Sequence, residues 1–396
     1  MKLKITIRGL IYIILLINPL LSLILDGTEI HFFYIEGPVL ALLLILNSLK
    51  SEINFYRTIC ATVITIFCVL FAYIEGSSIG KINNHLFNFL DMILLIFFSI
   101  NKVEIDYFKN FMKRNILIFL VVISITNIAE LYMLLTHKGY TYIYSWNGTF
   151  FQGTNSMPHT LSYLMLVVII FVICVLIETH MKYYTFLAII PSYCVFISGA
   201  RVSLVLCMIL DCIILSFVFT EKYKNLLIKA IKILPLVAVV LFIFKDKIIS
   251  SDLMNKIVAR NRSNNTSAGR VYMVNNLWNH YIYDSTFLQY LLGQGDDKTY
   301  YYNRTNSLVG VEVWAHNDVM QILIGKGFLG IVVYFSSIFL YFKKIIKKSG
   351  NIYSFGLITF ILVAILLNGF YSYRDIALSI PFIMMVNNEL SYKRED

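Results

Sequence analysis

Charged residues are scarce in this chain of 396 residues, at 14%, whereas hydrophobic residues make up 58%. A soluble protein of this length would not need so much apolar surface, so the composition excludes an ordinary soluble globular protein. The alternation of apolar and polar residues that marks the strands of an outer-membrane barrel is also absent. The chain instead contains repeated apolar runs of about 17 to 25 residues, the length with which a helix crosses a bilayer core.

Cysteine is missing from all polar segments. The six cysteines all fall within the apolar runs: Cys60, Cys68, Cys174, Cys194, Cys207 and Cys212. Their placement excludes a disulfide framework and a thiolate metal site in the outer segments. Internal repeats are not evident, and no basic face exists apart from the loops between runs, which argues against nucleic acid as a partner.

The apolar runs predict an all-α, polytopic integral membrane protein with about twelve transmembrane helices, since a backbone in lipid must satisfy its own hydrogen bonds. The first run follows basic residues, as in a signal peptide, but lacks a small-residue cleavage pattern, and we interpret it as a retained helix. Two runs are interrupted, 31–49 by Glu36 and Pro38 and 85–100 by Asp91. The predicted spans are 9–25, 31–49, 56–75, 85–100, 115–135, 160–177, 184–198, 202–220, 227–244, 319–342, 352–369 and 375–390.

The distribution of the 33 Lys and Arg residues predicts the orientation of these spans. Most of them lie in segments that share one side of the membrane if the N-terminus is cytoplasmic, as the positive-inside rule requires. The short loops of the other side hold only Lys81, Lys138, Arg201 and Arg374. We therefore expect both termini in the cytoplasm, one membrane domain over 1–396, and a large extracytoplasmic loop over 245–315.

The large outer loop has a helical pattern of its own. From Arg270, the spacing of apolar residues up to Ile282 predicts an amphipathic helix that lies in the interface plane, and Gly293-Gln294-Gly295 ends it. The three tryptophans, Trp146, Trp278 and Trp314, all fall in outer segments. They form either an interfacial aromatic belt or stacking platforms for sugar rings.

The most informative segment runs from Ala315 to Phe335. His316, Asn317 and Asp318 stand where the outer loop meets a span, and Gln321 follows one turn later. A titratable imidazole beside amide side chains at a helix entrance indicates chemistry at the membrane surface. The residues from Gly325 to Gly330 also fit a dinucleotide-binding glycine pattern, but no soluble strand precedes them, so helix packing explains these glycines better.

Two arginines are predicted on the same outer face as His316. Arg201 follows a tight Ser198-Gly199 turn, and Arg270 opens the amphipathic helix, where free backbone N–H groups add a positive dipole end. A snorkelling arginine and an ordinary helix-start residue are the plain alternatives. Together, two arginines suit a diphosphate through bidentate contacts, and a histidine can take the proton of an attacking hydroxyl. The set suits group transfer from a lipid-linked diphosphate.

The order and spacing of these residues resemble a known family. SGAR at 198–201, SAGR at 267–270, LLGQG at 291–295 and HNDVMQILIGKGFLG at 316–330 are similar to the O-antigen ligase and Wzy-type polysaccharide polymerase superfamily. The resemblance covers about residues 185–345, and the first half of the chain matches only in topology.

The resemblance implies a metal-independent glycosyltransferase without cofactors in the bacterial cytoplasmic membrane. Its donor would be an oligosaccharide on undecaprenyl diphosphate, and its acceptor a glycan hydroxyl. Further expected partners are membrane lipid, a flippase and a chain-length regulator protein.

The resemblance also implies which residues form the site. The catalytic residues would be Arg201 and Arg270, which bind the diphosphate, and His316, which activates the hydroxyl. Where this chain has Asp318, the family often has a bulkier residue. This difference leaves open whether the Asp318 carboxylate shares the role of general base with His316. The expected substrate-binding residues are Asn317, Gln321, Ser198, Ser267, Trp278 and Trp314.

Three functions stay open at this point. A capsule or O-antigen polymerase joins lipid-linked repeat units, and this is the expected function. A ligase of the same fold hands finished glycan to lipid A core, a wall polymer or a protein. A lipid-linked oligosaccharide flippase or transporter would line a midplane cavity with charges and show repeated halves. Polar residues gather instead at one predicted face, which favours an enzyme.

Overall fold

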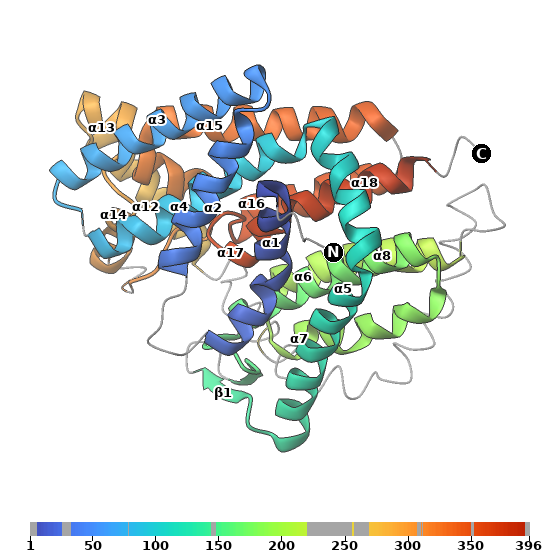
Figure 1. The fold of residues 1–396 in the computed structure, drawn as a ribbon. Helices are drawn as coiled ribbons and strands as arrows, with labels where there is room; N and C mark the ends of the chain where they lie inside the picture. The colour runs from blue at the N-terminus through green and yellow to red at the C-terminus, as the bar shows by residue number, and fades with distance from the viewer. Residues whose placement is uncertain are drawn as a thin grey trace. The chain divides into compact units, whose positions relative to one another are not determined.

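The protein is mostly helical (Figure 1). The structure, a computed structural model, describes residues 6–25, 33–77, 79–143, 148–219, 256, 269–306, 310, 312–349 and 352–392. These residues form two compact units, one of residues 1–122 and 269–396 and the other of residues 123–268. Each unit is described by itself.

The first unit is built around a buried helix, α4 (Ile79–Ser99). Nearly every side chain from Phe89 to Phe98 is buried, because α4 packs against α2 (Phe33–Ser48), α3 (Glu52–Ile74), α15 (Asp318–Ser349) and α18 (Ile380–Tyr392). Helices α3 and α15 run side by side in Figure 1 and contact each other. The unit also holds α1 (Ile7–Leu25), the first part of α5 (Lys102–Thr136), α16 (Ile352–Leu367) and α17 (Arg374–Leu378).

Three shorter helices of the first unit come from the predicted outer loop. They are α12 (Arg270–Tyr283), α13 (Phe287–Leu292) and α14 (Asp297–Thr305). Helix α13 begins with a capping box between Thr286 and Gln289, and Gly293 ends it. All three helices pack against α15, so the outer segment is fixed to the helix that follows it.

The second unit is built around α6 (Pro158–Thr179), whose apolar side chains are buried from Leu161 to Ile177. Proline at the first helical position favours the start of this helix. It contacts the 3-10 helix η2 (Lys182–Ala188), α7 (Ile189–Ile197) and α8 (Arg201–Phe219). The unit also contains the last part of α5 and a hairpin of β1 (Tyr140–Ile143) and β2 (Gly148–Phe151), paired antiparallel with Tyr140 opposite Phe151.

Apolar helices of spanning length confirm a helical membrane protein. By length and composition, six helices of the described residues are able to cross a membrane: α1, α3, α5, α6, α8 and α15. Shorter apolar helices cover Ile35–Ser48, Leu86–Ser99, Lys182–Ile197 and Tyr353–Leu367. The predicted span 227–244 lies outside the described residues, and the total of twelve spans stays a prediction.

The helices differ from the predicted spans in several details. Helix α5 starts at Lys102, well before 115, and its backbone leaves helical geometry at Asn115. The span predicted over 375–390 is split into α17 and α18 around Ser379. In the outer segment, α12 ends at Tyr283 before Gly293 is reached, and the Tyr-rich stretch forms α14.

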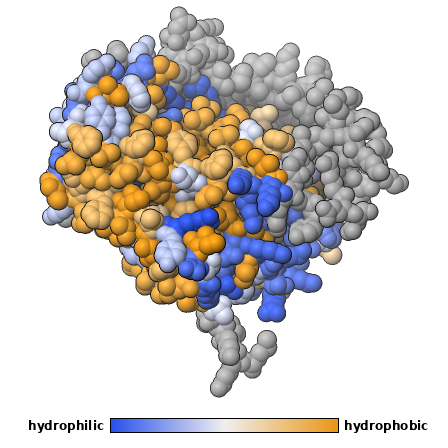
Figure 2. Space-filling model, turned by 90° about the horizontal axis from the view of Figure 1, so that it is seen from above, coloured by the Kyte–Doolittle hydropathy of each residue, from blue (hydrophilic) through white to orange (hydrophobic). Residues whose placement is uncertain are grey.

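The exterior of the first unit carries the hydrophobic surface that a lipid environment requires. Large apolar side chains are exposed along α3 and α15, among them Phe67, Leu70, Phe335 and Phe339. Much of the face in Figure 2 is hydrophobic, with hydrophilic side chains gathered near its lower centre and a second group toward its upper left. Contiguous apolar surface of this kind marks contact with a membrane or a partner.

Candidate functional site

The site is organised by the start of α15. The Asn317 Oδ1 atom accepts a hydrogen bond from the Met320 backbone N–H at 3.1 Å and so caps the helix. Its Nδ2 group donates to the Leu366 carbonyl at 2.9 Å. His316 precedes this cap with a φ of 50°, in the left-handed region that residues other than glycine seldom adopt. The strained backbone is held by the cap, a pattern typical of functional positions.

One amide oxygen connects the predicted base to a predicted arginine. The Nη2 group of Arg270 donates to Asn368 Oδ1 at 3.1 Å, and the His316 Nδ1 atom lies 3.3 Å from the same oxygen. Arg270 is the first residue of α12, and Asn368 directly follows α16. Three segments that are distant in the sequence therefore converge on one side-chain atom.

The Asn368 contact fixes the proton arrangement of His316. A guanidinium only donates hydrogen bonds, so the Asn368 atom that faces Arg270 is the carbonyl oxygen, which only accepts. The His316 Nδ1 atom must then carry the proton, and Nε2 keeps its lone pair. Burial and, next, the positive charge of Arg270 lower the pKa of His316 to about 4, against the hydrogen bond to Asn368. The imidazole is thus neutral at physiological pH and able to accept a proton at Nε2.

The Trp314 ring packs against the His316 ring and also contacts the Tyr373 ring. The Trp314 ring lies 4.6 Å from the His316 ring and 5.2 Å from the Tyr373 ring, centroid to centroid. Gly369 has a φ of 98°, and a Cβ atom there would lie 2.5 Å from the Trp314 ring and 2.8 Å from Asp318 Oδ1. Glycine after Asn368 therefore permits close packing of this turn against Trp314.

The Asp318 carboxylate holds the segment that follows Asn368 and Gly369. Its Oδ2 atom accepts hydrogen bonds from the Tyr334 hydroxyl at 2.7 Å, the Phe370 N–H at 2.7 Å and the Tyr371 N–H at 3.2 Å. The side chain is fully buried. These bonds fix the chain next to Asn368, so a positioning role accounts for Asp318 without a share in base work.

Gln321 ties the start of α15 to the loop between α13 and α14. Its Oε1 atom accepts from the Ala315 N–H at 3.1 Å, and its Nε2 group donates to Thr299 Oγ1 at 3.0 Å and the Asp296 carbonyl at 3.2 Å. The side chain is fully buried. This geometry favours support of the site over the substrate contact expected for Gln321.

The glycines of α15 allow the loop between α13 and α14 to pack closely against this helix. Gly327 has a φ of 63° and interrupts the helix, and the Gln294 N–H donates to the Ile324 carbonyl at 2.6 Å. A Cβ atom on Gly325 or Gly293 would collide with the opposite segment. Next to this contact, Lys326 Nζ forms a buried ion pair with Asp296 Oδ2 at 2.6 Å. The glycines therefore serve close backbone packing.

The second unit holds the other predicted arginine. Arg201 is the first residue of α8 and is half-buried. The preceding Gly199 has a φ of 67° and lies against the Phe150 ring, where a side chain would collide. Ser198 Oγ donates to the Val195 carbonyl at 2.7 Å and accepts from the Ala200 N–H at 3.3 Å. Lys256 Nζ donates to the Gly199 carbonyl at 3.0 Å, so this turn is rigidly braced.

The structure brings Arg270, Trp314, His316 and Asn317 together in the first unit. Arg201 and Ser198 belong to the second unit, and Ser267 lies outside the described residues, as does Trp146. Trp278 lies on α12 with 47% of its surface exposed, so it is open to a ligand or to lipid.

Sequence reasoning missed Asn368 and Tyr373. Both follow an apolar run, in the segment NGFYSYRD from 368 to 375, whose density of polar and aromatic residues was the available signal. Burial raises the pKa of the Tyr373 phenol, with smaller opposite effects of its hydrogen bond to Asn368 and the charge of Arg270. The phenol therefore stays protonated beside the histidine.

These groups combine a cation, a helix N-terminus and a neutral base in one half-buried place, an arrangement suited to an anionic leaving group and an attacking hydroxyl. Residues 186–335 match the family described as O-Antigen ligase. No curated protein matches the chain. The apolar helices and this match indicate a protein of the bacterial inner membrane with a ligase-type or polymerase-type role in polysaccharide synthesis. The match over residues 186–335 supports the resemblance of this part of the chain to the O-antigen ligase and Wzy-type polymerase superfamily.

Proposed function

We propose that this protein is a polysaccharide polymerase that transfers a glycan from undecaprenyl diphosphate to a hydroxyl of an acceptor repeat unit. The observation that carries the proposal is the shared contact of Arg270 and His316 with Asn368 Oδ1, at 3.1 and 3.3 Å. This contact supports the proposal, because it holds a cation that suits a leaving diphosphate beside a neutral imidazole that suits an attacking hydroxyl.

The donor side of the reaction uses positive charge. Arg270 stands at the first position of α12, where backbone N–H groups lack helical partners and the helix dipole is positive. Only two of its donors are needed for a bidentate phosphate contact, so its bond to Asn368 orients the guanidinium without excluding the ligand. Arg201, which opens α8 in the same way, is proposed as the second cation of the diphosphate site.

The acceptor side uses the free Nε2 atom of His316. The acceptor hydroxyl oxygen bonds to the anomeric carbon of the donor while the bond from that carbon to the diphosphate oxygen breaks. The hydroxyl proton moves to Nε2, and the bonding electron pair leaves with undecaprenyl diphosphate. The leaving group is already acidic, so charge stabilisation by arginine suffices and no proton donor is required.

The sugars of donor and acceptor need a surface of their own. Trp314 packs against both His316 and Tyr373, so its ring forms part of the wall beside the base. A sugar that stacks on this wall would present its hydroxyl close to Nε2. Trp278, exposed on α12, is proposed as a more distant contact for the glycan.

The proposal places the site on the extracytoplasmic face, with twelve spans and both termini in the cytoplasm. Support comes from the distribution of Lys and Arg. A cysteine introduced in place of Ser263 should react with a membrane-impermeant maleimide in intact spheroplasts. Protection of this cysteine until the membrane is broken would overturn the orientation.

A ligase that passes finished glycan to lipid A core, a wall polymer or a protein is the second candidate, favoured by the description of the matching family. Gel analysis of surface glycan in a deletion strain separates the two. Single repeat units on the carrier or acceptor support the polymerase, whereas long chains left on the carrier support the ligase. In the complemented strain, Arg270→Ala and Arg201→Ala should reproduce the deletion pattern while the protein still inserts. A wild-type pattern from either variant would remove that arginine from the mechanism.

A further inference from the structure

A groove of about 420 Å³ lies at the other end of α15 from the site, between α3, the turn before α5 and the last turns of α15. We propose that this groove binds the phosphate of an anionic lipid headgroup. Five cationic side chains line it: Arg57, Lys102, Lys343, Lys344 and Lys347. They come from three segments that the positive-inside rule assigns to the cytoplasmic side, so the fold gathers charges that the sequence leaves apart.

No carboxylate is among the described residues that line the groove. Among the residues that the structure describes, none of the five forms a hydrogen bond or an ion pair. The positive charges of Lys102 and Lys347 are close enough to Lys344 to repel its ammonium group. Like charges at short distance repel, and an anion between them would convert this repulsion into attraction.

Two helix N-termini add to the positive potential. Helix α3 begins at Glu52, and its cap residue Ser51 makes no side-chain hydrogen bond to the first turn. Helix α5 begins at Lys102, after Asn101. Ser51, Asn101 and Lys102 all line the groove, whereas Glu52 does not. At α5 the Asn101 side chain already accepts a hydrogen bond from the Val103 N–H at 3.1 Å, so the first turn of α3 is the more favourable place for phosphate oxygens.

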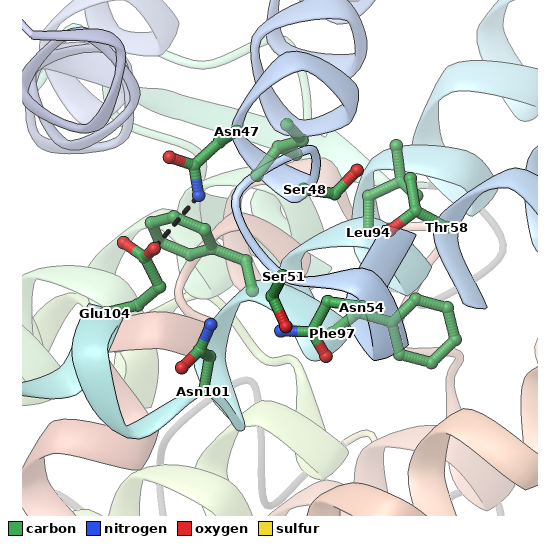
Figure 3. Close-up of a pocket in the computed structure, with 11 residues that line it drawn as sticks. Asn47, Ser48, Ser51, Asn54, Thr58, Leu94, Phe97, Asn101 and Glu104 are labelled. Carbon is green, nitrogen blue, oxygen red and sulfur yellow. Dashed lines mark hydrogen bonds between the residues drawn. The ribbon is translucent and has the colours of Figure 1, made fainter. Parts of the chain in front are cut away.

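The inner wall of the groove consists of neutral hydrogen-bonding groups. Ser51, Asn54 and Asn101 line both the groove and a smaller polar cavity next to it (Figure 3). The carboxylate of that cavity, Glu104, accepts hydrogen bonds from Asn47 at 3.1 Å and Arg8 at 2.9 Å. Its charge is therefore engaged by Arg8, and hydroxyl and amide groups are left to face a ligand.

Apolar surface beside the groove favours a lipid as the source of the phosphate. Ile53 and Leu340 line the groove itself, and Ile53, Tyr56 and Phe339 are exposed around it, at 64%, 64% and 66%. Acyl chains could follow this surface while the headgroup occupies the basic pocket. Basic pockets between transmembrane helices on the cytoplasmic side are places where anionic headgroups bind.

The groove is distinct from the site at His316. The two places lie at opposite ends of α15, on either side of the interruption at Gly327, and no residue of the site lines the groove. The diphosphate donor at Arg270 cannot fill both places at once. The inference therefore holds whichever glycan reaction the site performs.

Native mass spectrometry of the full chain tests the proposal. The protein is released from phosphatidylcholine vesicles that contain phosphatidylglycerol, and retained phosphatidylglycerol is counted. Lys344→Gln/Lys347→Gln should weaken retention roughly tenfold or more, since each cation near a lipid surface contributes about 1 kcal/mol. The matched control Lys113→Gln/Arg114→Gln removes the same charge from exposed positions of α5 outside the groove and should leave retention within about twofold. Arg57→Gln, on another helix, should weaken retention in the same direction as the double variant.

Equal losses from the groove variants and the control would overturn the proposal, because general surface charge would then explain the binding. Undiminished retention in Lys344→Gln/Lys347→Gln would also overturn it. Inorganic phosphate is added in a parallel arm. Displacement of phosphatidylglycerol by millimolar phosphate would identify a free anion as the ligand in place of a lipid, whereas persistence of the lipid supports the proposal.

Discussion

The two ends of α15 use polar residues in opposite ways. At the first end, His316 is half-buried, and its Nδ1 atom and the Arg270 guanidinium contact the same Asn368 oxygen. At the last end, Lys343, Lys344 and Lys347 line an open groove and form no bond with another described residue. One end is a set of groups bonded to each other, and the other is a set of like charges.

The difference separates a place that is organised before a ligand arrives from a place that needs a ligand to be organised. A pre-formed hydrogen-bond network lowers the cost of reaching a transition state, as catalysis requires. A cluster of uncompensated cations lowers its energy only when an anion binds. We therefore propose chemistry at the start of the helix and lipid contact at its end.

The buried ion pair in the middle of α15 should give the largest effect on stability. Lys326→Met removes the ion-pair partner of the buried Asp296 carboxylate and should lower the free energy of unfolding by about 3 to 5 kcal/mol. Denaturant titration in detergent micelles measures this loss. The double variant Asp296→Leu/Lys326→Met removes both charges and should recover most of it. An unchanged unfolding midpoint in Lys326→Met would show that the pair does not hold the site loop on α15.

Asn368→Leu tests the organised end directly. The variant removes the acceptor shared by Arg270 and His316 and should lower kcat/KM about 10- to 100-fold, as expected for hydrogen bonds to charged groups. The control is Asn387→Leu, which removes a buried amide from α18, bonded to Ser354 and remote from His316 in the chain. Equal losses from both variants would reduce the role of Asn368 to general stability.

The pH dependence of kcat/KM reports the protonation of His316 in the free enzyme. A base works only when it is deprotonated, and burial and Arg270 lower the pKa of His316 to about 4. Activity should thus persist as the pH falls through 6.5, the ordinary histidine value, and decline near pH 4. Asn368→Asp places a negative charge beside the ring, favours the protonated form and should move the decline to higher pH. An acid limb at 6.5 in the wild type would contradict the buried, neutral base.

The basic end should give the smallest effect on catalysis. Lys344→Gln/Lys347→Gln removes two lysines far from His316, and it should leave the transfer rate in detergent within about twofold and the free energy of unfolding within about 0.5 kcal/mol. Transfer assays and denaturant titration in a lipid-free detergent check both values. A large loss of activity would couple the two ends and break the comparison.

The helices were largely predictable because apolar runs of spanning length leave few alternatives in a membrane. All predicted spans in the described residues fall on helices, and α12 begins at Arg270 as its pattern predicts. Helix α14 was missed because its hydrogen bonds, such as Asn303 Nδ2 to the Val313 carbonyl, depend on the tertiary fold. The hairpin at 140–151 was missed for another reason, since each of its two strands has only 4 residues, too few to show a clear alternating pattern.

The candidate site was predictable only in part. His316, Asn317 and Arg270 stand out because polar residues at helix starts are visible in a sequence. The role of Asn368 depends on a contact across 98 residues to Arg270 and 52 residues to His316, which no local pattern encodes. The supporting role of Gln321 is equally hidden, because spacing alone places it one turn after Asn317 and does not reveal its bonds to Asp296 and Thr299.

The most direct test of the account is a transfer assay with purified protein and an oligosaccharide linked to undecaprenyl diphosphate, wild type against His316→Ala. Wild-type protein should release undecaprenyl diphosphate and form a longer glycan. His316→Ala, with an unchanged size-exclusion profile, should be slower by about 100-fold or more, as expected for loss of a general base. Transfer at the wild-type rate by folded His316→Ala would contradict the proposed mechanism.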